Sequence, residues 1–123
     1  MAQLAQEGCD ISDYTAEVSE AYKQYFWVHT LNNAAVVLLA LLYGEGDLAK
    51  SITISVMAGW DTDCNGATVG SILGAMLGAK ALPQEWVGQF NDTMHSAVFG
   101  FDHARISDLA ERSFKTYLAI NGK

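Results

Sequence analysis

The segment Gly59-Trp60-Asp61-Thr62-Asp63 carries the two carboxylates whose spacing is best suited to chemistry. In an extended loop alternate side chains point the same way, so Asp61 and Asp63 would face one side. Paired carboxylate oxygens suit a hard divalent cation such as Mg²⁺ or Mn²⁺. On a helix the two side chains would lie roughly 200° apart and could not share one ion. A metal site therefore requires a loop here, and Gly59 at its start favours one.

A structural explanation stands beside the metal site. Asp63 precedes a helical pattern, and as an N-cap it would accept hydrogen bonds from the amides of Asn65 or Gly66. From spacing alone this is the more common explanation, because an Asp-x-Asp tripeptide often arises by chance. Free amides at a helix N-terminus also attract phosphate, so a metal ion and a phosphorylated ligand would fit the same place.

The other candidate side chains carry weaker signals. His29 lies between an aromatic cluster and an apolar helix, where a lone histidine is more often a hydrogen-bonded structural residue. A helix N-terminus would lower the thiol pKa of Cys64, but the two neighbouring carboxylates act in the opposite direction. We therefore expect Cys64 to have a packing role. His95 and His103 have no acidic partner at metal-ligand spacing, and we assign them no role.

Helical periodicity dominates the segments that would position these residues. Residues 14–26 repeat apolar side chains at helical spacing, with Ser12 or Asp13 as the expected cap. Residues 31–43 are apolar on nearly all sides, which predicts a central helix buried by several neighbours. Thr30 would cap that helix, and Asn32 and Asn33 would hydrogen-bond locally in its first turn. Residues 48–58 are ambiguous between helix and strand. A helix capped by Asp47 is expected, because no matching partner strand exists.

The segment 64–80 predicts a helix with an unusual stripe of glycines. Gly66, Gly70, Gly74 and Gly78 recur every four residues, each costing about 1 kcal/mol relative to alanine. Such a cost is tolerable if the stripe lets another backbone approach closely. Pro83 would open a short helix over 84–90, residues 91–105 look irregular, and a last helix would start at a Ser107 cap and stop at Gly122. The sum is a compact, multi-helix, all-α domain over residues 1–123.

Composition limits the partners and the location. The net charge is -7 and no basic patch is visible, which argues against binding nucleic acid or an anionic membrane surface. Two uncharged stretches, 30–44 and 64–79, are shorter than the roughly 20 residues needed to span a bilayer. Cys9 and Cys64 form no disulfide framework or zinc motif. The N-terminus lacks the features of a signal peptide, so a cytoplasmic location is expected.

Residues 27–81, and more loosely the remainder to Arg112, resemble the C-terminal part of the ADP-ribosylglycohydrolase family. The family pattern Gly-x-Asp-Thr-Asp-Thr, or Gly-x-Asp-Thr-Asp-Cys in one bacterial branch, is followed by small residues and glycines. Together with its flanking sequence the match is far more specific than a bare Asp-x-Asp. The matching signatures are His29-Thr30-Leu31-Asn32-Asn33, Ala40-Leu41-Leu42-Tyr43-Gly44-Glu45-Gly46-Asp47 and Ala58-Gly59-Trp60-Asp61-Thr62-Asp63-Cys64-Asn65-Gly66-Ala67-Thr68-Val69-Gly70.

The resemblance implies an all-α fold and cleavage of an N- or O-glycosidic bond to ADP-ribose at a dinuclear Mg²⁺ or Mn²⁺ centre. By this analogy Asp61 and Asp63 are metal ligands. The backbone at Gly59 and Gly66 would approach the ligand, and His29 would belong to the pocket wall. The family often has a threonine ligand after the second aspartate. Cys64 stands there instead, and that role is not transferred, because a thiol is a soft ligand. No residue is assigned as catalytic.

The chain also departs from the family pattern. Family enzymes are longer, and a Thr-Asp-Asp metal motif from their N-terminal part is absent from these 123 residues. The chain therefore looks like the C-terminal portion of such an enzyme, with an incomplete ligand set and weak activity or none by itself. The missing ligands would come from an N-terminal chain or another copy, and a homo-oligomer is expected.

Two other functions remain open. One is a non-catalytic, truncated helical module that mediates interaction or oligomerisation without a complete metal site. Loss of covering helices would leave it with exposed apolar faces, which favour self-association. The other is an unrelated helical protein in which Asp63 only caps a helix.

Overall fold

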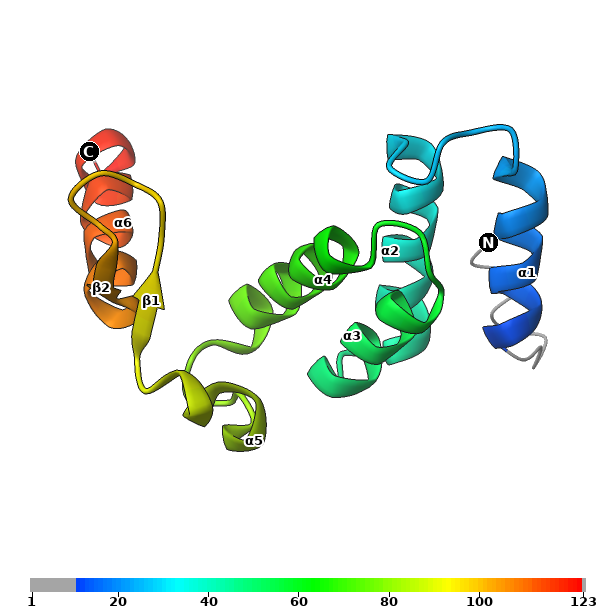
Figure 1. The fold of residues 1–123 in the computed structure, drawn as a ribbon. Coiled ribbons are helices and arrows are strands. Elements are labelled where there is room, and N and C mark those ends of the chain that lie inside the picture. The colour runs from blue at the N-terminus through cyan, green and yellow to red at the C-terminus, as the bar shows by residue number, and fades with distance from the viewer. Residues whose placement is uncertain (1–10, 123) are drawn as a thin grey trace. The chain divides into compact units, whose positions relative to one another are not determined.

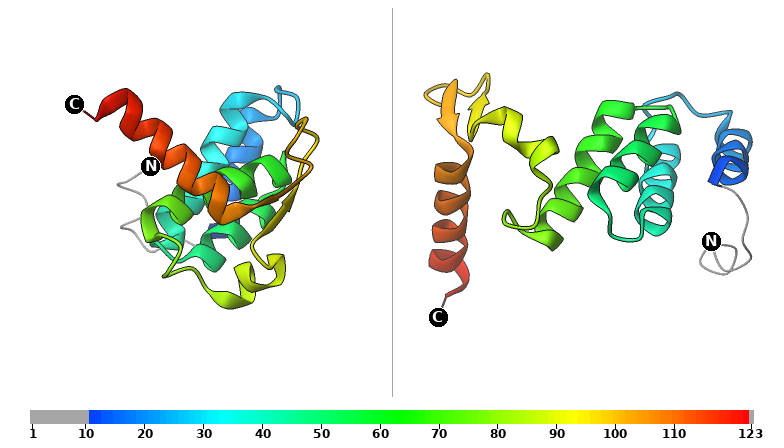
Figure 2. Two further views of the ribbon diagram at one scale, coloured as in Figure 1. Left: turned by 90° about the vertical axis from the view of Figure 1, so that its left-hand side faces the viewer. Right: turned by 90° about the horizontal axis from the view of Figure 1, so that it is seen from below.

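Helices account for nearly all the regular structure of residues 11–122, the part of the chain that this computed structural model describes (Figure 1; Figure 2). The chain divides into two compact units, Met1–Leu82 and Pro83–Lys123. The first contains α1 (Ile11–Tyr22), α2 (Thr30–Gly44), α3 (Leu48–Met57) and α4 (Thr62–Leu77). The second contains α5 (Gln84–Val87), the 3₁₀ helix η2 (Gly88–Phe90), strands β1 (Thr93–His95) and β2 (His103–Arg105), and α6 (Ile106–Asn121). The predicted all-α class is confirmed, whereas the single domain over residues 1–123 stays a prediction.

A hydrophobic core cluster of the first unit lies where α1 meets α2. Tyr14 and Val18 of α1 pack with Val36 and Leu39 of α2, and Trp60 packs against this cluster from the loop before α4. Helix α3 packs against both α2 and α4, so α2 lies between α1 and α3 (Figure 1). The ambiguous segment 48–58 is a helix, as expected. Asp47 caps it by accepting a hydrogen bond from the Lys50 amide at 2.7 Å.

Helix α2 is buried on one side only. Asn32, Val36, Leu39, Ala40 and Gly44 are buried, but Leu31, Leu38 and Leu42 are 50%, 45% and 39% exposed. The expectation that neighbours cover this helix on nearly all sides is therefore wrong for the part of the chain that the structure describes. The cap also differs, because His29 and not Thr30 is the N-cap residue.

The glycine stripe of α4 faces α3 over only half its length. A Cβ at Gly66 would lie 3.4 Å from Val56 Cγ2, and one at Gly70 would lie 3.5 Å from Ile52 Cδ1, both on α3. A Cβ at Gly74 would meet nothing within 4 Å among the described residues, and Gly78 is the C-cap with φ 76°. The prediction that the stripe lets another backbone approach closely is thus wrong, because the atoms nearest to Gly66 and Gly70 are side-chain atoms at ordinary van der Waals distance.

The second unit contains a hairpin where irregular structure was expected. Strands β1 and β2 pair antiparallel, with Thr93 opposite Arg105 and His95 opposite His103. Strands of three residues are too short to show an alternating pattern, which is why sequence reasoning missed them. The hairpin brings the two histidine rings to 5.0 Å between centroids.

The caps of the second unit differ in part from expectation. Pro83 is the N-cap of α5 rather than a residue of its first turn. Ser107 lies within α6, whose N-cap Arg105 makes no side-chain capping bond. The Asp92 carboxylate serves instead, accepting hydrogen bonds from the Ser107 amide at 2.8 Å and the Ser107 hydroxyl at 2.6 Å. Gly122 is the C-cap, as predicted. No helix within residues 11–122 is long and apolar enough to cross a membrane.

Candidate metal centre at the start of α4

The loop between α3 and α4 reverses the chain with two residues in the left-handed region. Gly59 has φ 81° and Trp60 has φ 63°. Glycine adopts this conformation freely, whereas tryptophan does so only when the surrounding structure holds it. The Trp60 side chain packs against the core between α1 and α2, which provides part of that restraint. The turn at Gly59 and Trp60 thus sets the position of Asp61 at the start of α4.

Asp61 and Asp63 come together in a way that differs from the expected extended loop. Helix α4 already begins at Thr62, which places Asp63 in its first turn and Asp61 at the N-cap. Ligand atoms of Asp61, Asp63 and Cys64 nevertheless lie within 4.8 Å of one another. This convergence is possible because Asp61 is outside the helix, with φ -84° and ψ 71°. The helical spacing of roughly 100° per residue therefore does not apply to it.

The capping interpretation of Asp63 is wrong. The N-cap position belongs to Asp61, whose side chain makes no capping hydrogen bond. Both carboxylates lie at the helix N-terminus, where the helix dipole favours negative charge. Two carboxylates in that position are hard oxygen donors that fit Mg²⁺ or Mn²⁺.

Cys64 is an exposed member of the cluster, not the packed residue that the sequence suggested. The pKa of its thiol is raised, chiefly because the thiol donates a hydrogen bond to Asp61. The negative charge of Asp61, partial desolvation and the charge of Asp63 raise it further. The thiol therefore stays protonated at neutral pH, and it suits neither nucleophilic attack nor ligation of Mg²⁺.

Asn33 connects this cluster to the start of α2. Its Oδ1 accepts hydrogen bonds from the Asp61 amide at 3.1 Å and from Asn65 Nδ2 at 2.8 Å. Its Nδ2 donates to the carbonyls of Trp27 at 2.8 Å and His29 at 2.9 Å. The sequence predicted only local hydrogen bonds for Asn33, such as those to the Trp27 and His29 carbonyls. The bonds to Asp61 and Asn65 cross about thirty positions, and spacing along the chain gave no signal for them.

Three other residues were expected near the ligand. His29 caps α2, with Nδ1 accepting from the Leu31 amide at 3.2 Å, and its ring stacks on Tyr25 at 4.3 Å between centroids. Gly66 faces α3, and a Cβ at Gly59 would meet nothing within 4 Å among the described residues. In the structure His29 caps α2 and Gly66 packs against α3. The ligand-binding roles of His29, Gly59 and Gly66 stay predictions.

A groove of about 450 Å³ runs along α2 beside the carboxylates. Its apolar wall includes Val37, Leu38 and Leu41 of α2, and its polar end includes Asp61 and Cys64. The apolar surface of α2 that the sequence assigned to a buried core therefore lines, in part, a groove next to the candidate metal ligands.

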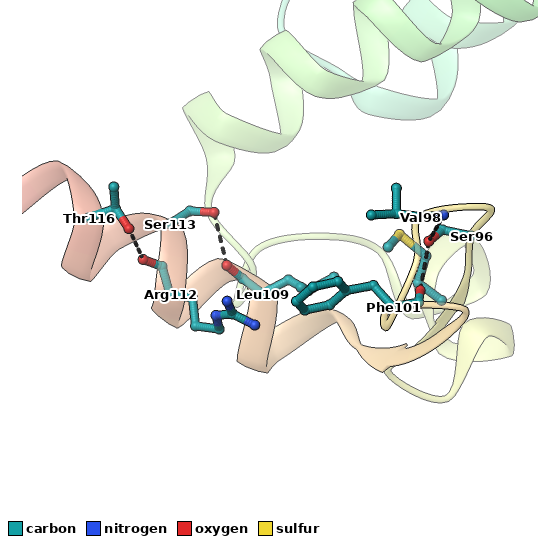
Figure 3. A pocket seen from close by; sticks show the side chains of 8 residues that line it. Ser96, Val98, Phe101, Leu109, Arg112, Ser113 and Thr116 are labelled. Carbon is teal, nitrogen blue, oxygen red and sulfur yellow. Dashed lines mark hydrogen bonds between the residues drawn. The ribbon is translucent and has the colours of Figure 1, made fainter.

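A second hollow, of about 570 Å³, lies within the second unit between the hairpin and α6 (Figure 3). The Arg112 guanidinium stacks over the Phe101 ring at 4.8 Å from its centroid. The hydroxyls of Ser113 and Thr116 donate to carbonyls of their own helix. None of the residues lining this hollow belongs to the carboxylate cluster, and the chemistry that the sequence predicts lies in the first unit.

Comparison with known proteins supports the family resemblance that the sequence motif indicated. The family model described as ADP-ribosylglycohydrolase matches residues 1–121 of the chain. No curated protein matches, and no solved structure matches. The match covers both the Asp61–Asp63 motif and the Asn32–Asn33 pair.

Proposed function

The chain belongs to the ADP-ribosylglycohydrolase family, and from this premise we propose that it takes part in metal-dependent hydrolysis of a glycosidic bond to ADP-ribose. Asp61 and Asp63 are the proposed ligands of Mg²⁺ or Mn²⁺. The observation that carries the proposal is the convergence of their oxygens at the start of α4, within 4.8 Å together with the Cys64 sulfur.

The residues of the site have separate tasks in this proposal. Asp61 and Asp63 present hard oxygen donors and hold the cation at the end of the groove. Cys64 stays protonated, donates a hydrogen bond to Asp61 and does not ligate the metal. When bound, the cation would orient the ribose hydroxyls and activate water for attack at an anomeric carbon of oxocarbenium character. The apolar groove beside the site would keep bulk water from part of the ligand.

Two carboxylates are an incomplete ligand set for a dinuclear centre. We propose that the remaining ligands come from an N-terminal segment of the family type or from a second copy of the chain. Binding of Mn²⁺ by the chain alone is then weak, and so is its activity.

Calorimetric titration tests the metal role. We expect Mn²⁺ to bind weakly to the wild-type chain and not at all to Asp61→Asn/Asp63→Asn, because the amides remove both negative ligands. We also expect ADP-ribose to bind only in the presence of Mn²⁺, with EDTA as the control. Equal heats from the two proteins would contradict the metal site, and submicromolar wild-type affinity would show a complete ligand set.

The second candidate function is a helical interaction module without catalysis. The exposed Leu31, Leu38 and Leu42 on α2 favour it, because a contiguous apolar surface marks an interaction site. It predicts self-association that is independent of Mn²⁺ and absence of ADP-ribose binding under any metal condition. The same titrations, repeated with light scattering, distinguish the two functions.

A further inference from the structure

The geometry of the carboxylate cluster depends on a turn in which Trp60 holds an unusual backbone conformation. Trp60 has φ 63°, a conformation that non-glycine residues rarely adopt. The following residue, Asp61, has φ -84° and ψ 71°, outside the helical and extended regions. Such a backbone persists only where contacts from elsewhere hold it. The polar contact that reaches Asp61 from α2 is the hydrogen bond that its amide donates to Asn33 Oδ1 at 3.1 Å.

Asn33 is itself held from the other side. Its Nδ2 donates to the Trp27 and His29 carbonyls, at 2.8 and 2.9 Å. These bonds orient the carboxamide, because the nitrogen must face the carbonyls and the oxygen must face the donors. The oxygen also accepts from Nδ2 of Asn65, a buried residue in the first turns of α4. One side chain therefore joins three segments: the one before α2, the N-cap of α4 and its first turns.

We propose that Asn33 is a positioning residue of the metal centre, a role that rests on the proposed metal function of Asp61 and Asp63. Its Oδ1 fixes the Asp61 amide relative to α4, and this keeps the Asp61 carboxylate within ligand distance of Asp63. A neutral carboxamide suits the task, because it accepts two N–H bonds without adding a negative charge to the cluster. Without it, the Gly59–Trp60 turn can relax and the two carboxylates can separate.

Asn32 offers a matched control one residue away. Its Nδ2 donates to the carbonyls of Phe26 and Trp27, at 3.4 and 3.3 Å, so it contacts the same preceding segment as Asn33. Asp61 and Asn65 receive no bond from it among the described contacts. Asn32→Ala therefore perturbs the start of α2 and leaves the link to the metal loop intact, whereas Asn33→Ala removes both.

The experiment measures Mn²⁺ affinity by electron paramagnetic resonance of the free ion, at a temperature well below the melting point of each variant. We expect Asn33→Ala to weaken Mn²⁺ binding at least fivefold and Asn32→Ala to change it less than twofold. Asn33→Asp keeps an oxygen for Asp61 and Asn65 but loses the donation to Trp27 and His29. We expect it to melt at a lower temperature than wild type and to bind Mn²⁺ at least as tightly.

The outcomes separate this role from the proposed function. If the wild-type chain binds no Mn²⁺, the metal function and the role of Asn33 both fail. If wild type binds and Asn33→Ala binds equally well, the role of Asn33 alone is overturned. If Asn33→Ala does not fold, Asn33→Asp decides: loss of Mn²⁺ affinity in that variant would mean that Asn33 serves only the stability of α2.

Discussion

At the residue scale, the carboxylate cluster forms because its two members occupy different backbone states. Asp63 is in the first turn of α4 and Asp61 is just outside it. If both residues were helical, their side chains would point in different directions. If both were extended, no helix would begin at Asp63, and no helix dipole would favour the two negative charges. The junction of loop and helix supplies both the convergence of the oxygens and a favourable field for negative charge.

The reactivity of the Cys64 thiol depends on its contact with the Asp61 carboxylate. The Asp61 carboxylate is the main cause of the raised thiol pKa, so Asp61→Asn should lower that pKa and increase the thiolate fraction near neutral pH. We expect iodoacetamide to alkylate Cys64 faster in Asp61→Asn than in the parent chain, both in a Cys9→Ser background. The rates are followed by mass spectrometry across pH. An unchanged rate profile would show that no such thiol–carboxylate contact forms in solution.

At the element scale, the end of α2 and the first turn of α3 approach each other closely. A Cβ on Gly44 would lie 1.7 Å from Ser51 Oγ and 2.9 Å from Ser51 Cα. Ser51 is fully buried, so its backbone cannot give way without separating the two helices. This contact, rather than the glycine stripe on α4, requires a glycine.

Two alanine substitutions test this difference. We expect Gly44→Ala to lower the free energy of unfolding by about 1–3 kcal/mol or more, through overpacking. We expect Gly74→Ala to raise it by up to about 1 kcal/mol, because a Cβ there meets nothing within 4 Å and alanine favours the helix. Urea unfolding followed by circular dichroism measures both. If both variants lost a similar free energy of unfolding, the contact between Gly44 and Ser51 would not be what requires a glycine.

The start of α6 should respond to acid through Asp92. Hydrogen bonds from the Ser107 hydroxyl and amide lower the pKa of Asp92 below its ordinary value of 3.8, and Arg105 contributes less. A carboxylate with a lowered folded-state pKa contributes stability above its unfolded pKa and loses it as the pH falls through the folded value.

Asp92→Asn tests this contribution. We expect the variant to melt below wild type at pH 7 and the difference to shrink once the pH falls below 3.8, where protonation removes the charge from wild type too. Thermal melts followed by circular dichroism across this range measure the effect. A difference that persists unchanged in acid would mean that the charge of Asp92 is irrelevant.

At the scale of the whole molecule, exposed apolar side chains predict assembly. Leu31, Leu38 and Leu42 lie exposed on α2. A C₂ dimer is the commonest way to cover such a surface. Each chain has a net charge of -7, but physiological salt screens the repulsion between chains. This repulsion therefore does not prevent a specific apolar contact.

Light scattering at micromolar concentration measures the mass. We expect a homo-oligomer, most simply a dimer, and we expect Leu42→Glu to shift it towards monomer more than Met57→Glu does. Leu42 belongs to the α2 surface, and Met57 is the control from another helix. A mass near 13.3 kDa without binding of a hydrophobic dye would mean that the chain closes its own core.

The sequence by itself determined the helical class, most helix boundaries, the Asp47 and Gly122 caps, and the family through the motif at Asp61 and Asp63. These are local properties, because periodicity, capping residues and a contiguous motif are all encoded within a few positions. It failed for the three-residue strands of the hairpin, whose pairing depends on residues eight to twelve positions away.

Only the tertiary structure decided how the site is held. The hydrogen bond from Asp61 to Asn33 and the packing of Trp60 against the core each join the loop before α4 to another element, and the contact of Gly44 with Ser51 joins α2 to α3. The exposed surface of α2 was likewise invisible in its sequence, because an apolar pattern shows what prefers burial and not which neighbours are present to bury it. Contacts between distant segments depend on how the helices pack, and that packing determines whether two aspartates become one site.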